Sequence, residues 1–187
     1  ANLIAEGATF RCWAPHAKAV YVVGDFNHRI RNDAALLTRD QQGHWRGFFP
    51  GVKDRQRYMF YVVGEGSEGL KRDPYARELE SPFPAECLIR RTDFPWHESG
   101  YVTPPFHEFV IYQLHVGTFF TPNLPHKGGT FLDVARKLPY LADLGVTALQ
   151  LMPIQEFQTS FSLGYNGTDY FSPEMDFAVA DAELPAY

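Results

Sequence analysis

The sequence predicts a multidomain protein in which β structure comes first and α/β structure follows. Residues 1–66 contain short runs rich in Val, Tyr, Phe and Trp, separated by turn residues, which is typical of a β-sandwich. Residues 109–187 change to an order of strand, helix and strand, the repeating unit of parallel α/β folds. Residues 67–108 are rich in Pro, Gly and charge, and are predicted to be a connector.

The first domain is predicted to hold four strands, because four β-prone runs are bounded by residues that favour turns. These runs are residues 9–13, 19–24, 43–49 and 57–64. Trp45 lies within the third run, and we expect its large apolar ring to fill the core of the sandwich.

The helix of the α/β region is predicted over residues 130–144, where apolar residues recur at spacings of three and four. Thr130 and Asp133 have the spacing of an N-terminal cap, and Gly145 stands where a helix ends. Pro139 lies inside this pattern, and an interior proline removes a backbone hydrogen bond. We therefore expect a kink or a break there.

The two strands that flank this helix are predicted over residues 110–116 and 145–153. Both are apolar with little alternation, a pattern that favours strands buried on both faces.

Four ordered motifs in the second region resemble the opening of the catalytic barrel of the α-amylase superfamily, glycoside hydrolase family 13. They occupy residues 112–119 (Tyr-Gln-Leu-His-Val-Gly-Thr-Phe), 144–153, 164–166 and 169–173. Within the superfamily they are most similar to glycogen branching enzymes, trehalose-releasing hydrolases and isoamylase-type debranching enzymes.

The first region also resembles a known family, in residues 10–15, 22–27, 58–60 and 71–76. It is similar to the immunoglobulin-like sandwich of carbohydrate-binding module 48. Together the two resemblances imply an immunoglobulin-like β-sandwich followed by the first strands and helix of a (β/α)8 TIM barrel, which would be incomplete in this chain.

Two tryptophans on which glycan-binding members of the module stack sugars are missing. The chain has His28-Arg29-Ile30 where the first is expected and residues 64–67 (Gly-Glu-Gly-Ser) where the second is expected. We therefore interpret the sandwich as a structural domain and not as a strong independent binder of glycogen.

The substrate-binding residues that the resemblance implies are Tyr165, Asn166 and Asp169, in the loop after the second strand of the α/β region. In the superfamily the tyrosine of this Gly-Tyr pair stacks on the sugar at the cleavage point. Asn166 and Asp169 would bond sugar hydroxyls or orient the loop, although such residues equally often bond their own backbone in turns.

Other conspicuous residues of the region receive structural interpretations. Tyr170 and Phe171 are predicted to pack inside the loop, and His115 to be satisfied within the fold. Pro153 and Gly164 are interpreted as residues that shape the backbone. Glu156 has no identifiable partner in the sequence and is interpreted as a structural anion.

No catalytic residue is predicted within the chain. Retaining glycosidases need two carboxyl groups ~5–5.5 Å apart, and in the superfamily these follow later barrel strands whose motifs do not occur here. We expect them beyond residue 187, and we expect this piece alone to be inactive. No metal site and no cofactor are predicted, and the spacing of the two cysteines suggests neither a metal nor a redox site.

The resemblance implies a 1,4-α-glucan branching enzyme with a retaining double-displacement mechanism. A trehalose-releasing, debranching or amylase-type hydrolase remains an alternative, as does a non-catalytic glycan-binding module. The expected partners are an α-1,4-glucan (glycogen, starch or a maltooligosaccharide) and the remainder of the catalytic barrel.

Charge and hydropathy argue against two classes of partner. The net charge is −5 with both signs interspersed, so there is no basic stripe for a nucleic-acid backbone. No run of 18 apolar residues is present, so the sequence predicts no membrane span. With no secretion signal apparent and two widely spaced cysteines, we expect a cytoplasmic protein.

Overall fold

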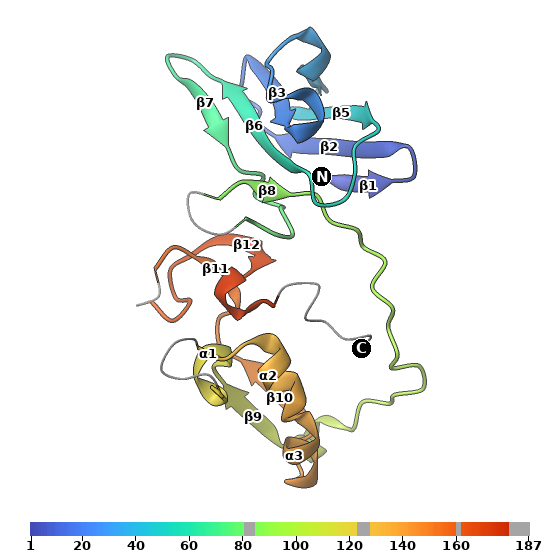
Figure 1. Ribbon diagram of the computed structural model, residues 1–187, viewed down its shortest axis with the longest axis vertical. Helices are drawn as coiled ribbons and strands as arrows, with labels where there is room; N and C mark the ends of the chain where they lie inside the picture. Colours follow the sequence, from blue (N-terminus) through green and yellow to red (C-terminus); the bar gives the residue numbers. More distant parts are fainter. Residues whose placement is uncertain (81–84, 123–127, 160–161, 180–187) are drawn as a thin grey trace. The chain divides into compact units, whose positions relative to one another are not determined.

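A computed structural model describes residues 1–80, 85–122, 128–159 and 162–179. The chain divides into two compact units, Ala1–Phe94 and Pro95–Tyr187. The end of the predicted barrel segment, residues 180–187, lies outside the described residues. Each unit has its own sheets (Figure 1) and its own apolar core.

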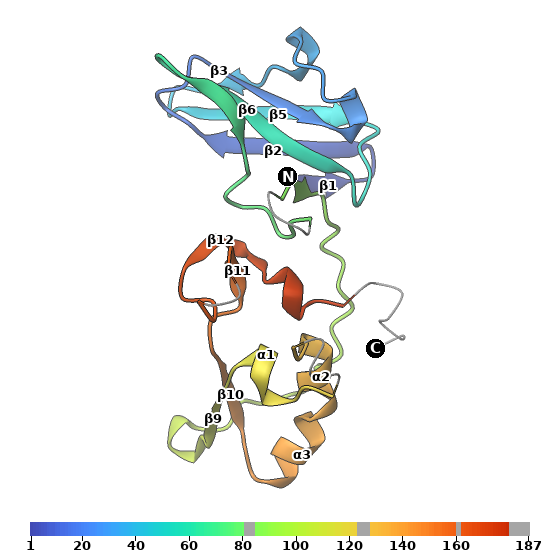
Figure 2. The ribbon, with the colours of Figure 1, turned by 60° about the vertical axis from the view of Figure 1, so that its left-hand side comes forward.

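The first unit is built from two antiparallel sheets (Figure 2). One has the order β1-β2-β5-β4, with strands Asn2–Ile4, Gly7–Trp13, His44–Pro50 and Thr38–Arg39. The other has the order β3-β6-β7, with β8 also paired to β6; its strands are Ala19–Gly24, Arg57–Val63, Glu68–Lys71 and Cys87–Leu88. The four strands predicted from the sequence are thereby confirmed.

The core of this unit lies between the two sheets, because buried side chains come from both. Phe10 of β2 meets Tyr58 of β6 edge to face, with ring centroids 5.1 Å apart. Trp45 is 5% exposed and its Nε1 donates a hydrogen bond to the Ala14 carbonyl at 2.9 Å, which confirms its predicted place in the core. Cys12 and Cys87 are also buried and are not joined in a disulfide.

The segment predicted to be a connector contributes two strands to the first unit. β7 and β8 both pair with β6, so residues 68–71 and 87–88 extend the second sheet. Between them, the buried carboxylate of Asp73 accepts a hydrogen bond from the Tyr58 hydroxyl at 2.7 Å. The sequence did not predict these strands, because the segment is polar and rich in proline. Each strand is short and depends on pairing with β6 rather than on its own apolar pattern.

The second unit contains the predicted strand–helix–strand order. Strands β9 (Ile111–Leu114) and β10 (Ala148–Leu151) are parallel, with Ile111 opposite Ala148. The described residues between them in the chain form three helices: α1 (Val116–Phe119), α2 (Phe131–Arg136) and α3 (Leu138–Asp143). A second, antiparallel pair follows, β11 (Gln155–Phe157) and β12 (Gly167–Pro173). Single 3-10 turns cover Phe106–Glu108 and Met175–Phe177.

The predicted helix over residues 130–144 is broken in two at Lys137, as Pro139 led us to expect. Thr130 caps α2, since its hydroxyl accepts from the Asp133 amide and the Asp133 carboxylate accepts from the Thr130 amide. Pro139 lies in the first turn of α3. Backbone amides in the first turn have no acceptor within the helix, so the proline removes no helical hydrogen bond there. Gly145 follows α3 with φ +92°, a left-handed conformation that suits glycine.

The prediction that both strands are buried on two faces is wrong for the described chain. Ile111 is 55% exposed and Leu151 is 38% exposed, while Leu114 is buried against the helices. Among the described residues β9 and β10 pair only with each other, so side chains that do not meet α2 or α3 remain open to solvent. In the part of the chain that the structure describes, no helix has the length and apolar character needed to cross a membrane.

Candidate functional site

The candidate substrate loop joins β11 to β12 and is shaped by Pro153 and Gly164. Gly164 has φ +88°, and a Cβ there would lie 2.7 Å from the Cβ of Pro153. Gln155 donates from its side-chain amide to the Gly164 carbonyl at 2.9 Å, which fixes the turn against β11. Only glycine fits this combination of positive φ and close contact, consistent with the backbone-shaping role predicted for both residues.

The three predicted substrate-binding residues differ in their exposure to solvent. Tyr165 is 70% exposed and Asn166 is also exposed, so both are open to a ligand. Asp169 is only 5% exposed and lies opposite Glu156 in the β11–β12 pair. The structure therefore presents Tyr165 and Asn166 on one solvent-facing turn and turns Asp169 toward the interior.

The prediction that Tyr170 and Phe171 pack inside the loop is wrong. Tyr170 is 75% exposed and Phe171 is 59% exposed. The pairing of β11 with β12 shifts register on both sides of Glu156, so the buried positions of β12 are Asp169 and Ser172. A bulged strand does not keep strict alternation, so two adjacent residues of β12, Tyr170 and Phe171, are both exposed.

Beneath the turn lies a group of buried carboxyl groups, Asp169, Glu156 and Glu174, each no more than 6% exposed. Glu156 accepts a hydrogen bond from the Met175 amide at 3.1 Å, and Glu174 accepts one from the Phe157 amide at 3.0 Å. These two reciprocal bonds tie β11 to the turn that follows β12. Glu156 thus has the structural role predicted for it, with partners that sequence alone did not identify.

The electrostatics of this group are unusual. Burial, reinforced by the charge of Glu174, raises the pKa of Glu156 to about 7. Burial also raises the pKa of Glu174 above its ordinary value. Glu156 can therefore hold a proton near neutral pH, but its side chain is enclosed by the fold and does not reach the solvent-facing turn.

His115 follows β9 and stands at the start of α1. Its ring meets Phe177 edge to face, with centroids 5.5 Å apart, and its Nδ1 lies 3.4 Å from the Thr118 hydroxyl. Its Nε2 is buried and has no hydrogen-bond partner among the described residues. Within the same residues, no group of three His, Cys, Asp or Glu side chains is placed to hold a metal ion.

Sequence reasoning missed a second candidate region, an open pocket in the first unit with a volume of about 460 Å³. Its lining comes from four separate segments, near residues 1–2, 9–13, 44 and 73–77. The one available signal was the spacing of Thr9, Arg11 and Trp13, which places their side chains on one face of a strand.

Comparisons with known proteins find one match within the first unit and others that cover most of the chain. Residues 1–76 match the family model for carbohydrate-binding module 48, described as the isoamylase N-terminal domain. The 1,4-α-glucan branching enzyme GlgB of Lactiplantibacillus plantarum is 35% identical over 98% of this chain, and GlgB 1 of Streptomyces avermitilis is 30% identical over 94%. A crystal structure of a putative α-amylase from Salmonella typhimurium superimposes over 95% of the chain with a TM-score of 0.78 and 25% identity.

The chain belongs to the α-amylase superfamily. It carries a carbohydrate-binding module 48 domain and lies near the glycogen branching enzymes within the superfamily. This superfamily member spans less than a third of the proteins it matches, namely 30% and 21% of the two branching enzymes and 28% of the Salmonella chain.

Proposed function

We propose that residues 1–187 form part of a 1,4-α-glucan branching enzyme that acts by a retaining double displacement. The observation that carries this proposal is the 35% identity to a branching enzyme across 98% of the chain, which includes both units and not the sandwich alone. The proposal assigns the nucleophile and the general acid to other parts of that enzyme. An α-1,4-glucan, the polymer that the relatives' name specifies, would be the substrate.

Within this function the exposed turn of the second unit is proposed to contact the glucan. Tyr165 would offer a flat ring to the apolar face of a sugar, and Asn166 would exchange hydrogen bonds with its hydroxyls. Asp169 would support the turn from inside, because its carboxylate is buried beneath it.

The parallel pair β9 and β10 with its intervening helices is proposed to be the start of a (β/α)8 barrel. Two features support this: the strands are parallel, and exposed apolar side chains such as Ile111 leave room for neighbours. The remaining barrel strands would then be the partner that covers them. A cytoplasmic location is part of the same proposal, supported by two buried cysteines that are not joined in a disulfide.

The proposal is tested with the gene product that carries this chain, incubated with amylose and assayed for α-1,6 branch points and new reducing ends. Branch points without a matching rise in reducing ends are the expected result. Reducing ends without branch points would favour the hydrolase alternative. If the folded protein makes neither product, the non-catalytic glycan-binding module becomes the better supported alternative.

A further inference from the structure

Asn166 and Gly167 form the one asparagine–glycine pair in the sequence. Such a pair is chemically labile, because the backbone nitrogen that follows an asparagine can attack its side-chain carboxamide. Glycine has no Cβ to obstruct the approach, and it gives the backbone the freedom that ring closure requires. The other four asparagines precede leucine, histidine, aspartate and leucine, whose side chains hinder the same attack.

The Asn166 side chain is exposed at the end of the turn that Gly164 shapes. The hydrogen bonds of this turn are made by other groups. Gln155 donates to the Gly164 carbonyl at 2.9 Å, and the Tyr165 amide donates to the Ser162 carbonyl at 3.1 Å. Among the described residues no hydrogen bond holds the Asn166 carboxamide. The carboxamide is therefore free to rotate over the nitrogen of the next residue.

Gly167 is the first residue of β12 and lies opposite Phe157, the last residue of β11. This pair closes the antiparallel ladder at the turn, and the register shifts next to it, between Glu156 and Phe157. The end of a strand pair opens more readily than its centre. The Gly167 nitrogen is therefore placed where local opening exposes it without separating the rest of β11 and β12.

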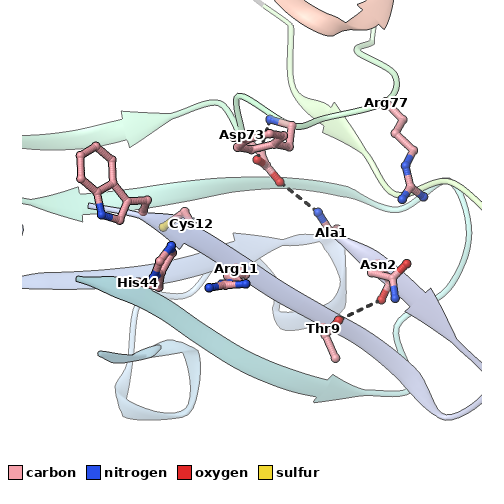
Figure 3. Close-up of a pocket in the computed structure, with 10 residues that line it drawn as sticks. Ala1, Asn2, Thr9, Arg11, Cys12, His44, Asp73 and Arg77 are labelled. Carbon is pink, nitrogen blue, oxygen red and sulfur yellow. Dashed lines mark hydrogen bonds and ion pairs between the residues drawn. The ribbon is translucent and has the colours of Figure 1, made fainter. Parts of the chain in front are cut away.

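The other described asparagines are held by the fold. The Asn27 side chain makes two hydrogen bonds to backbone groups, at 2.9 and 2.8 Å. The Asn32 side chain caps a 3-10 turn by accepting from the Ala35 amide at 3.2 Å. Asn2 lies in β1, where its carbonyl accepts from the Thr9 hydroxyl at 3.5 Å (Figure 3). These asparagines serve as internal references for the reactivity of Asn166.

We propose that Asn166 and Gly167 form a self-modification site, at which the chain converts Asn166 into aspartate and isoaspartate. The Gly167 nitrogen loses its proton to solvent and bonds to Cγ of Asn166, while the Cγ–Nδ2 bond breaks and ammonia leaves. Water then opens the resulting five-membered succinimide. Cleavage between the nitrogen and Cγ gives aspartate, and cleavage between the nitrogen and the backbone carbonyl carbon of residue 166 gives isoaspartate.

Both products change the turn that carries Tyr165. Each replaces a neutral carboxamide, which donates and accepts, with a carboxylate that only accepts, and isoaspartate also lengthens the main chain by the Cβ atom. This consequence rests on the proposed function, in which Asn166 exchanges hydrogen bonds with the glucan. Modified chains should therefore bind glucan less well. A bound glucan should in turn engage the carboxamide and slow its cyclisation.

The test incubates the gene product that carries this chain at mildly alkaline pH and follows each asparagine by peptide mass spectrometry. Conversion of Asn166 is expected to be at least roughly tenfold faster than that of Asn27 or Asn32. A methyltransferase specific for isoaspartate measures that product separately. Conversion of Asn166 no faster than that of Asn27 and Asn32 would overturn the proposal.

Two variants test the succinimide route. Gly167→Ala keeps the asparagine and adds only the methyl group that obstructs ring closure, although the new Cβ would lie 2.6 Å from the side chain of Gln155, which must shift. Asn166→Gln leaves the glycine unchanged, and its longer side chain would have to close a six-membered ring. Each variant is expected to slow conversion at residue 166 by at least roughly tenfold. Parent-like rates in both would exclude the succinimide.

Maltoheptaose separates this site from the proposed function. Slower conversion of Asn166 in saturating maltoheptaose, with Asn27 unaffected, would support both. Rapid conversion of Asn166 that the sugar does not slow would support the modification site and contradict the glucan contact proposed for the turn. No preferential conversion of Asn166, in a gene product that makes branch points, would overturn the site and leave the branching activity standing.

Discussion

Glu156 shows how a single buried carboxyl group can make local stability depend on pH. Burial is the main cause of its raised pKa, and the acidic neighbours Glu174, Asp169 and Asp176 raise the pKa further. The folded state therefore binds a proton that the unfolded state releases near its ordinary value of 4.5. Because the folded state binds more protons between about pH 4.5 and 7, the stability contributed by this group is lost as pH rises through that window.

Glu156→Gln should remove most of this dependence, because the amide keeps an acceptor for Met175 and carries no charge. We expect the variant to gain up to about 3 kcal/mol relative to the parent chain between pH 5 and pH 8. Hydrogen exchange at the Phe157 and Met175 amides, which the carboxyl groups accept from, measures the effect locally. Equal exchange in parent and variant at both pH values would contradict it.

Tyr165 and Tyr170 offer a matched pair of exposed rings, 70% and 75% exposed, the first in the turn at Gly164 and the second in β12. If the Gly164 turn presents Tyr165 to the glucan, Tyr165→Ala in the gene product should lower kcat/KM on amylose by at least about tenfold. Tyr170→Ala should stay within about threefold. Equal losses in both variants would indicate a general effect on the loop rather than a contact by Tyr165.

At the scale of elements, turn geometry can be separated into backbone strain and steric contact. Gly145 and Gly164 have nearly the same φ, +92° and +88°, but a Cβ would meet open space at Gly145 and the Pro153 side chain and carbonyl at Gly164. A residue with a Cβ would therefore be strained by the left-handed conformation at either position. Only at Gly164 would its Cβ also clash with a neighbour.

Gly145→Ala should lower the free energy of unfolding of the second unit by about 1–2 kcal/mol. Gly164→Ala should lower it by a further 1–3 kcal/mol or so, because the added methyl group must displace backbone. Urea unfolding followed by helix content compares the two variants directly. A Gly164→Ala variant as stable as Gly145→Ala would show that the Pro153–Gly164 contact relaxes without cost.

The elements themselves could be predicted wherever local pattern decides them. Runs rich in Val, Tyr, Phe and Trp between turn residues predicted the strands of the sandwich, and the Thr130 cap with Pro139 predicted a helix and its break. The short strands β7 and β8 could not be predicted, because they are stabilised by pairing with β6 and their own residues show no strand pattern. The exposure of Tyr170 and Phe171 follows from register shifts that no local pattern encodes.

For the whole molecule, the limits of the sandwich differ between sequence and structure. The sequence predicts a domain at residues 1–66, whereas the first compact unit runs to Phe94. The additional residues place Leu79, Cys87 and Ile89 in the core and give the buried Tyr58 hydroxyl its partner Asp73. The pocket of the first unit could not be predicted from the sequence either, because its lining residues come from segments more than 60 residues apart.

A fragment of residues 1–94 should therefore unfold cooperatively on its own. A fragment of residues 1–66 should be less stable by more than about 4 kcal/mol or show no cooperative transition, since it loses several core side chains and the carboxylate that accepts from the buried Tyr58 hydroxyl. Thermal unfolding followed by near-ultraviolet circular dichroism compares the two. Equal midpoints would establish the boundary predicted at residue 66.

The buried cysteines allow the opening of the first unit to be measured by alkylation. Both belong to the first unit, and residues 95–187 contain none. Alkylation requires a thiolate in contact with the reagent. Cys87 is fully buried and does not line the pocket, so it can react only when the core of the first unit opens, whereas Cys12 lines the pocket. The rate at which iodoacetamide consumes Cys87 therefore reports how often the sandwich opens, in the unmodified chain and without a signal from the second unit.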